Sequence, residues 1–255
     1  MSAHIHPTAL IDAAAEIGSG VTVGPYVVIG SGVVVGDDVE IMAAAQLLPG
    51  VTVGAGSRIY HGAILGGDPQ HIDSDRHASS TTIGEQVVIR EYVTVHRGIT
   101  QEGTLVGQGS MLMAYTHLGH DSHLGQQVII ANGVQVGGFV RIDDFASIGG
   151  MTPVHQKCSI GKHAFVGGGY RVVQDVPPYI LARGEPLSFG GLNVIGLRRQ
   201  KVGRKPRAAL KEAYRLIYRS DLLLVEAVQA IEQMEQTPEI ETVLRFIASS
   251  GRGLI

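Results

Sequence analysis

An aliphatic residue returns at every sixth position along most of the chain. The pattern runs from Ile5 to Leu65, resumes at Ile83, and is unbroken from Val106 to Val172. A period of six fits neither the 3.6-residue repeat of an α-helix nor the alternation of an ordinary strand. It is typical of hexapeptide repeats, in which each unit forms one short side and one corner of a parallel β-helix. The inward residues of the longest run are Val106, Leu112, Leu118, Leu124, Ile130, Val136, Ile142, Ile148, Val154, Ile160, Val166 and Val172.

Three hexapeptide units form one triangular coil of 18 residues, and neighbouring coils stack as parallel strands about 4.8 Å apart. A small or β-branched residue four places after the inward residue shares the interior. Glycine often follows the inward residue, as at Gly107 and Gly119, and we interpret it as easing the tight backbone of the corner. Each coil needs its neighbours to bury its interior, so a charge at a site such as Ile130 should not be tolerated. The period does not set the hand of the coil.

The repeat is interrupted twice before the long run. Residues 66–82 (GGDPQHIDSDRHASSTT) are polar and contain a proline, so we expect a loop that projects from the coils. Long loops in compact folds are often functional, although a tolerated surface insertion is the alternative. Residues 97–105 disturb the register a second time.

The repeat ends at residues 175–179 (DVPPY), because consecutive prolines cannot donate ladder hydrogen bonds. We predict a connector over residues 183–196, and helices from about residue 206, over 222–234 and over 242–247. The predicted domains are a β-helix over residues 1–190 and a helical domain over 191–255. Residues 201–219 carry seven Lys and Arg side chains, which form either a solvated helix face or a docking patch for an acidic partner.

Composition narrows the class of protein. The net charge of −3 argues against a protein coated with nucleic acid. The single cysteine, Cys158, excludes an intramolecular disulfide framework, fits a reducing compartment and occupies an inward slot where we expect inert packing. No apolar run is long enough to cross a bilayer. We therefore predict a cytoplasmic protein that does not bind nucleic acid and does not insert stably into membranes.

The segment 116–121 (THLGHD) concentrates chemistry against this aliphatic background. One coil after His120 the chain has Gly138, and one coil further it has Gln156, preceded by His155, so these residues should line one edge. His120 is a candidate general base whose ring Asp121 would orient. A backbone N–H of Gly138 would stabilise an oxyanion.

Metal binding is the rival use of the histidines. A catalytic zinc site needs three converging ligands, and the candidates are His117, His120, His123 and His155. The chain has no HExxH or CxxC spacing, so we predict no metal and no cofactor. A zinc hydratase and a non-enzymatic β-helix scaffold remain the alternatives to an enzyme that uses His120 as its general base.

Several stretches together resemble the UDP-N-acetylglucosamine O-acyltransferases, the family that begins lipid A synthesis. The matching segments are VTVHRG (93–98), AYTHLGHDSHLG (114–125), IDDFASIGGMTPVHQ (142–156), VGGGYRVVQDVPPYILARG (166–184) and AYRLIYRS (213–220). The resemblance implies a left-handed β-helix with a C-terminal helical domain, and a homotrimer with sites between subunits. It also implies transfer of a 3-hydroxyacyl chain from acyl carrier protein to the 3-hydroxyl of UDP-N-acetylglucosamine.

The resemblance gives roles to individual residues. His120 matches the family's general base, Asp121 its orienting partner and Gly138 its oxyanion donor. Gly168 matches a position that limits acyl-chain depth, where glycine leaves room for a longer chain. The other expected substrate-binding residues are Gln70 and His71 in the projecting loop, His96, His117, His155 and Gln156 along the edge, and Asn193 and Arg199 at the nucleotide.

Five positions depart from the commonest pattern of the family. They are His71 for aspartate, Asp73 for lysine, Phe139 for histidine, Ile195 for glutamate and Gln200 for arginine. The base and the scaffold are unaffected, but recognition of the acceptor is open. Transfer to a 3-amino UDP-sugar, which forms an amide, and a coenzyme-A-dependent sugar acetyltransferase are therefore the alternative activities.

Overall fold

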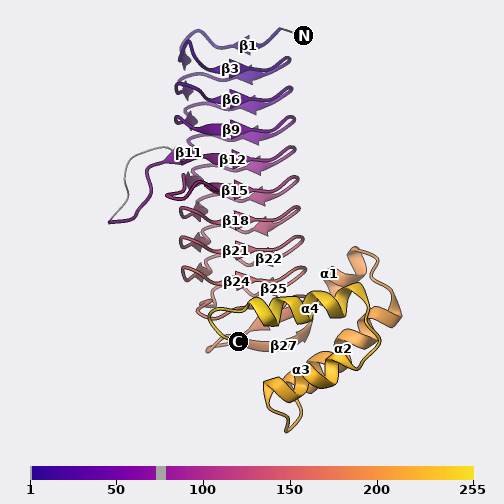
Figure 1. Cartoon of the computed structure of the whole chain (residues 1–255). Helices are drawn as coiled ribbons and strands as arrows, with labels where there is room; N and C mark the ends of the chain where they lie inside the picture. Colours follow the sequence, from indigo (N-terminus) through magenta and orange to yellow (C-terminus); the bar gives the residue numbers. More distant parts are fainter. Residues whose placement is uncertain (1, 73–78) are drawn as a thin grey trace.

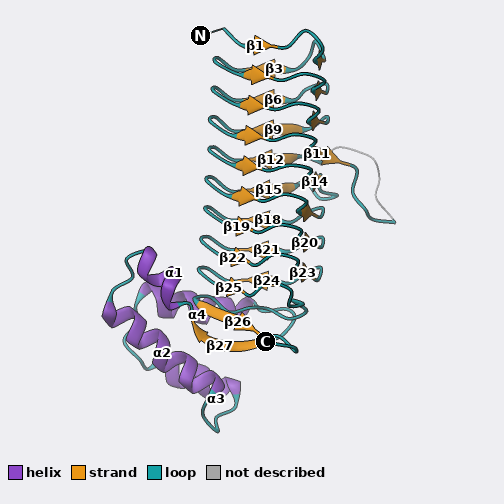
Figure 2. Cartoon of the chain, turned by 180° about the vertical axis from the view of Figure 1, so that it is seen from behind, coloured by secondary structure: helices purple, strands orange, loops and turns teal. Residues whose placement is uncertain are grey.

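A computed structural model describes residues 2–72 and 79–255. Figure 1 shows a tall prism of stacked coils, with the N-terminus at one end and a group of helices at the other. Three sheets, which we call A, B and C, form its sides, and Figure 2 shows the same stack from behind. The left-handed β-helix with a helical C-terminal region is confirmed.

The strands are short and follow one another from sheet A to B to C. Sheet A holds β1 (His4–Ile5), β4 (Thr22–Val23), β7 (Glu40–Ile41), β10 (Arg58–Ile59), β13 (Val88–Ile89), β16 (Met111–Leu112), β19 (Ile129–Ile130), β22 (Ser147–Ile148), β25 (Phe165–Val166), β26 (Ile180–Arg183) and β27 (Ser188–Leu192). Sheet B holds β2 (Leu10–Ile11), β5 (Val28–Ile29), β8 (Gln46–Leu47), β11 (Ile64–Gly67), β14 (Thr94–His96), β17 (His117–Leu118), β20 (Gln135–Val136) and β23 (Pro153–Val154). Sheet C holds β3 (Glu16–Ile17), β6 (Val34–Val35), β9 (Val51–Val53), β12 (Thr81–Ile83), β15 (Thr104–Val106), β18 (His123–Leu124), β21 (Arg141–Ile142) and β24 (Ser159–Ile160).

Strand pairing follows the predicted 18-residue coil. His4 pairs with Thr22, for example, in parallel register. The offset grows across the two insertions, where Arg58 pairs with Val88 and Val88 with Met111. Both insertions therefore leave the stack at a corner, and the strands resume in register after them.

The interior is made of the residues that the repeat predicts. Every inward aliphatic from Val23 to Val172 is buried, and the second interior position is filled by small or β-branched residues such as Val134, Ala146 and Cys158. Burial raises the pKa of the Cys158 thiol to about 11, which keeps the thiol protonated and unreactive, as expected.

The role that we gave to the recurring glycines is wrong. The left-handed corner residue lies three places after the inward residue, and non-glycine residues such as Tyr115 and Phe139 occupy it with φ near 60°. The glycine directly after the inward residue instead lies against the next coil. A Cβ on Gly107 would come within 2.4 Å of the Gly125 carbonyl oxygen. Close backbone stacking, and not φ, requires glycine there.

The structure corrects the boundaries at two places. Strands enter the predicted loop 66–82 at both ends, because β11 runs to Gly67 and β12 begins at the buried Thr81. Sheet A also continues past the prolines: β26 pairs parallel with β25, and β27 pairs antiparallel with β26. The expected connector over 183–196 is therefore mostly a hairpin strand followed by a short helix.

Four helices follow the hairpin. They are α1 (Val194–Arg199), α2 (Arg204–Tyr218), α3 (Leu224–Glu232) and α4 (Pro238–Ser249). Helix α1 was missed, and its N-cap is the Asn193 side chain, which accepts a hydrogen bond from Gly196 N–H at 3.0 Å. None of the helices in the described part of the chain is long and apolar enough to cross a bilayer.

Asp175 fastens the C-terminal tail to the last coil. Its buried carboxylate accepts from the N–H of Ser159 at 2.7 Å and of Gly251 at 3.0 Å, and from the Ser250 hydroxyl at 2.7 Å. The N–H of Arg252 donates to the same carboxylate at 3.1 Å. The tail thus closes the helical end of the prism through this side chain and through backbone hydrogen bonds of Asp175 with Gly253 and Ile255.

Candidate active site

His120 and Asp121 form a buried pair at the corner between sheets B and C. The Nδ1 atom of His120 lies 2.8 Å from Asp121 Oδ2, and both residues are 5 % exposed. Asp121 occupies the left-handed corner position with φ 54°, which aspartate tolerates better than most residues. The carboxylate fixes the ring so that Nε2 faces away from it, the arrangement that a general base needs.

The second insertion closes over Asp121. The N–H groups of Ile99 and Thr100 each donate to the carboxylate at 2.9 Å, and the Thr100 hydroxyl donates as well. Gly98 permits this approach, since a Cβ there would lie 2.7 Å from Asp121 Oδ1. Burial would raise the pKa of Asp121, but the hydrogen bonds from Thr100, Ile99 and His120 outweigh burial and lower it. Asp121 is thus held as a carboxylate beside His120.

Replacing Thr100 with valine should disturb the base through Asp121. The variant keeps the side-chain shape but removes the hydroxyl donor, so Asp121 becomes more basic and stabilises a protonated His120. We expect the acid limb of the kcat profile to move up by about half a pH unit, and kcat near neutral pH to fall about threefold. Measuring kcat against pH tests this.

Thr100→Ser is the matched control, because it retains the hydroxyl and should keep the acid limb of the wild-type protein. An unchanged profile in Thr100→Val would contradict a positioning role for Thr100. A fall in kcat without any movement of the limb would count against it too.

Gly138 lies beside the His120 ring, one coil further along the same edge. A Cβ on Gly138 would come within 2.5 Å of His120 Nε2, so only glycine leaves the ring its place. Phe139 N–H donates to the His120 carbonyl at 3.0 Å, and Lys157 N–H donates to the Gly138 carbonyl at 3.0 Å. These bonds confirm that His120, Gly138 and Gln156 belong to three successive coils. Among the described residues, Gly138 N–H has no hydrogen-bond acceptor.

Three more histidines gather next to this pair. The His71 and His120 rings lie 5.4 Å apart, and the His96 and His117 rings 4.9 Å apart, both edge to face. His117 Nδ1 lies 2.8 Å from the Thr94 hydroxyl. Burial, and then the neighbouring His96 and His120, lowers the pKa of His117 to about 4. His117 therefore presents a neutral imidazole at neutral pH.

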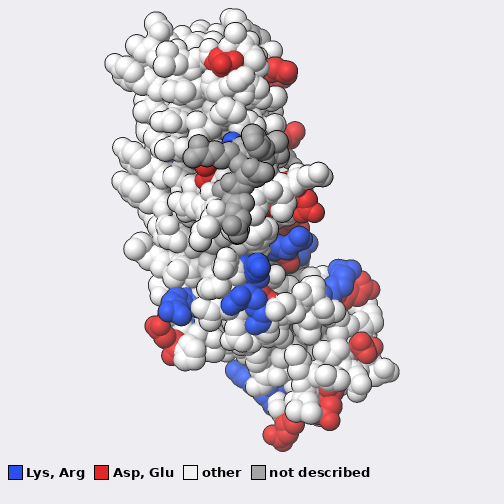
Figure 3. Space-filling view, turned by 60° about the vertical axis from the view of Figure 1, so that its left-hand side comes forward, with Lys and Arg blue, Asp and Glu red and all other residues white. Residues whose placement is uncertain are grey.

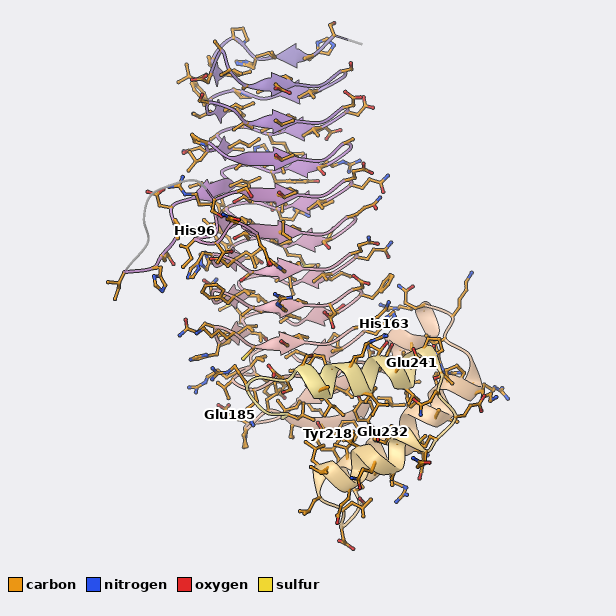
Figure 4. The ribbon with its side chains drawn as sticks, in the orientation of Figure 1. His96, His163, Glu185, Tyr218, Glu232 and Glu241 are labelled. Carbon is orange, nitrogen blue, oxygen red and sulfur yellow. The ribbon has the colours of Figure 1, made fainter. Side chains whose placement is uncertain are left out.

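His96, which Figure 4 labels near the projecting loop, has a buried polar atom to satisfy. Burial lowers its pKa, against the opposing effect of the Asp68 backbone. Its Nδ1 atom has no hydrogen-bond partner within the described residues. A substrate hydroxyl or amide beside His96 would supply one.

The histidines that the structure describes are not arranged as a metal site. Over residues 2–72 and 79–255, no group of three His, Cys, Asp or Glu side chains could hold a metal ion. His123 instead contacts the end of the second insertion, where its Nε2 lies 3.0 Å from the Gly103 carbonyl oxygen. His155 is exposed, with Nδ1 3.0 Å from the Gln156 carbonyl oxygen.

The remaining expected site residues lie at three different places. Gln70 and His71 are exposed at the start of the projecting loop, whereas Asp73 lies outside the described residues. Gly168 lies at the corner between sheets A and B, stacked on Gly150. Asn193 and Arg199 lie beside the corner between sheets C and A. One subunit therefore does not bring Asn193 and Arg199 together with His120.

Asn193 and Arg199 line a cavity with a volume of about 780 Å³. We call it the second cavity, because it lies apart from the site at His120. Its apolar wall comes from the outer face of sheet A, including Ile129 and Phe165, and its rim includes Ile195 and Gln200. The Asn193 side chain is already used, since it caps α1 and donates to the His163 carbonyl at 3.0 Å. Arg199 is exposed and is the cation available to a ligand in this cavity.

His163 supports the wall of this cavity as the middle ring of an aromatic stack. Phe145 lies 4.7 Å from it on one side and Tyr179 5.6 Å on the other. Burial, and then the charge of Lys162, lowers the pKa of His163 to about 4. Figure 4 labels His163 where the coils meet the helices.

The lowered pKa of His163 predicts acid sensitivity. Its ordinary pKa of 6.5 applies to the unfolded chain, so below pH 6.5 the unfolded state binds the extra proton. We expect His163 to account for a loss of about 3 kcal/mol in the free energy of unfolding between pH 6.5 and pH 4, and its own contribution to be complete at pH 4. His117 titrates over the same range.

His163→Phe should remove the part of this acid-induced loss in the free energy of unfolding that is due to His163. Phenylalanine already occupies the equivalent left-handed corner at Phe145, with φ 59°, so the backbone accepts it. Urea unfolding at pH 7 and pH 4.5 gives the two free energies. A pH dependence that is equally steep in the variant would assign the acid sensitivity to other groups.

Comparison with known proteins supports one family. A family model described as UDP N-acetylglucosamine O-acyltransferase, domain 2, matches residues 175–255, and one described as GMPPB C-terminal domain matches residues 5–101. The crystal structure of a UDP-N-acetylglucosamine acyltransferase from Bacteroides fragilis is 39% identical, covers 98% of this chain and 99% of its own, and has a TM-score of 0.96. The enzyme from Francisella novicida is 33% identical, with coverages of 98% and 93% and a TM-score of 0.96. The one from Moraxella catarrhalis is 35% identical, with 98% and 99% and a TM-score of 0.94.

Proposed function

The chain belongs to the UDP-N-acetylglucosamine O-acyltransferase family, and from this premise we propose that it begins lipid A synthesis in the cytoplasm. In this proposal a 3-hydroxyacyl chain passes from acyl carrier protein to the 3-hydroxyl of UDP-N-acetylglucosamine. The observation that carries the proposal is the buried His120–Asp121 pair with Gly138 beside its ring.

The chemistry is a direct transfer. His120 Nε2 takes the proton of the sugar hydroxyl as its oxygen attacks the thioester carbonyl. Gly138 N–H donates to the oxyanion that forms. The intermediate then expels the carrier-protein thiolate, which takes the proton back from His120, so that an ester and a free thiol result. Asp121 stays ionised throughout and stabilises the imidazolium.

A homotrimer with sites between subunits fits the separation of the site residues. His120 lies at the corner between sheets B and C, whereas Asn193 and Arg199 lie beside the corner between C and A. In a cyclic trimer one corner of a subunit faces a different corner of its neighbour. The nucleotide would then be held by Asn193 and Arg199 of one subunit while the sugar reaches His120 of another.

Helix α2 is our candidate dock for the carrier protein. Figure 3 shows Lys and Arg side chains gathered over the last coils and the helical region. Between α2 and β27 lies a cavity of about 830 Å³ with Phe189 and Tyr214 in its wall. Lys211, Arg215 and Arg219 line the same cavity, which suits an acidic protein that inserts an apolar side chain.

Reversing the charge of Lys211 should weaken the binding of acyl carrier protein and leave the binding of the UDP-sugar unchanged. We expect Lys211→Glu to raise the KM for acyl carrier protein about tenfold, with the KM for the UDP-sugar unchanged, because like charges then face each other. Steady-state kinetics with each substrate varied in turn measures both constants. Arg58→Glu, an equal charge change on the outer face of sheet A, is the control. An unchanged carrier-protein KM would move the dock away from α2.

One turnover experiment tests the reaction itself. A 3-hydroxyacyl carrier-protein donor is offered UDP-N-acetylglucosamine and its 3-amino analogue side by side, and each donor is compared with an acyl coenzyme A. Preference for the hydroxyl sugar with the carrier-protein donor would support the proposal. The position of His71 against the His120 ring favours the 3-amino sugar as the second candidate acceptor, since this loop departure lies next to the base. Turnover only with coenzyme A would overturn the proposed donor.

A further inference from the structure

We propose that Lys157 binds the diphosphate of the nucleotide sugar, an inference that rests on the proposed function. Lys157 lies at the left-handed corner position of the coil that follows Gly138. Lys157 is not among the site residues expected from the sequence. The chemical class of its ligand is the diphosphate group that links a nucleoside to a sugar.

A column of three side chains leads from Lys157 to the base. The Phe139 ring packs edge to face on the His120 ring at 5.1 Å, and the Lys157 ammonium lies 5.9 Å from the centre of the Phe139 ring. The cation–π contact draws the ammonium back along the edge toward His120. Figure 2 shows β20 and β23, the strands that lead into these two corners, one above the other. The side chain of Lys157 therefore points along the substrate edge.

The spacing suits a sugar nucleotide. Corner positions on successive coils lie about 4.8 Å apart, roughly the span of one sugar ring. The 3-hydroxyl at His120 and the diphosphate on C1 are attached to ring carbons that are separated by one carbon, C2. A diphosphate would consequently reach the level of Gly138 or of the next coil, where the flexible Lys157 side chain can meet it.

The direction is set by the second cavity. Asn193, in the wall of this cavity, donates to the carbonyl of His163, which lies six residues after Lys157 and therefore further from His120 along the prism. In a trimer whose axis runs along the prism, equal coils of neighbouring subunits lie at equal heights. The nucleotide base held by Arg199 of a neighbour would then lie on the Lys157 side of His120, and the diphosphate between them.

One other cation near His120 is already engaged. On the opposite side of His120, Arg97 forms an ion pair with Asp68 at 2.8 Å. No ion pair joins Lys157 to a carboxylate among residues 2–72 and 79–255. Gln200 carries no charge to offer from the second cavity, so we assign the two phosphates to Lys157 and Arg199.

Calorimetric binding of UDP and of uridine to the full-length protein tests the proposal. We expect Lys157→Met, which keeps the aliphatic stem on Phe139, to weaken UDP binding about tenfold to hundredfold and to leave uridine binding unchanged. Lys157→Arg should restore most of the affinity for UDP. Lys205→Met, which removes an ion-paired lysine on α2, is the matched control and should leave both affinities unchanged.

The outcomes separate this inference from the proposed function. Unchanged UDP affinity in Lys157→Met, or an equal loss for UDP and uridine, would overturn the diphosphate contact alone. An effect confined to the KM for acyl carrier protein would assign Lys157 to the phosphate of the donor's prosthetic arm and would also overturn it. Failure of the wild-type protein to bind UDP would instead overturn the proposed function.

Discussion

His120→Ala should abolish nearly all turnover while the protein remains folded. Removal of a positioned general base costs about a hundredfold to ten-thousandfold in rate, and we expect the upper part of this range because Asp121 acts only through the His120 ring. The KM for the UDP-sugar should change less than kcat. Steady-state kinetics in the carrier-protein assay measures both.

The His120 variant needs evidence that its fold is intact. His120 is buried, so urea unfolding of the variant should accompany the kinetics. His6→Ala, at an exposed histidine in the first coil, is the control for removing an imidazole and should keep full activity. Full activity in His120→Ala would remove this residue from the mechanism.

Asp175→Ala should be the most destabilising change of a polar residue. The substitution deprives Ser159, Ser250, Gly251 and Arg252 of their common acceptor in a site that is 0 % exposed. We expect a loss of about 4 kcal/mol in the free energy of unfolding, since each bond to a buried charge contributes about 1.5–3 kcal/mol and the tail can relax. Urea unfolding at equal protein concentration measures it.

Asp37→Ala is the matched control for Asp175. Asp37 accepts a hydrogen bond from Ser19 N–H at 2.7 Å, the same contact between coils that Asp175 makes with Ser159, but it is exposed. Its loss should cost less than about 1 kcal/mol. If both variants lose the same stability, the clamp on the C-terminal tail is not what holds the helical end together.

The repeat made the fold and the main edge of the site predictable. The period of six can be read from short stretches of sequence. Because three hexads form one coil, residues 18 positions apart, such as His120 and Gly138, are predicted to be neighbours in space. The clamp on Asp121 was not predictable in the same way, because Ile99 and Thr100 lie in an insertion that follows no period. Its only signal was the disturbed register.

The other errors arise where one residue type serves two purposes. Glycine relieves a left-handed φ or a close contact, and the sequence does not say which, so Gly107 was misread. Pro177 and Pro178 do end the hexads, yet sheet A continues beyond them through β26, because proline restricts only its own donor. Helix α1 was missed because Asn193 was interpreted only as a nucleotide contact, whereas its side chain also caps this helix.

The corner columns give this architecture a particular capacity for evolutionary change. Asp121, Phe139 and Lys157 occupy equivalent left-handed positions on three successive coils, and their side chains lie outside the interior. An exchange at one corner therefore alters what one level of the edge can recognise without repacking a sheet. Substrate preference in such a protein can drift one coil at a time, while the interior ladder of aliphatic residues stays fixed.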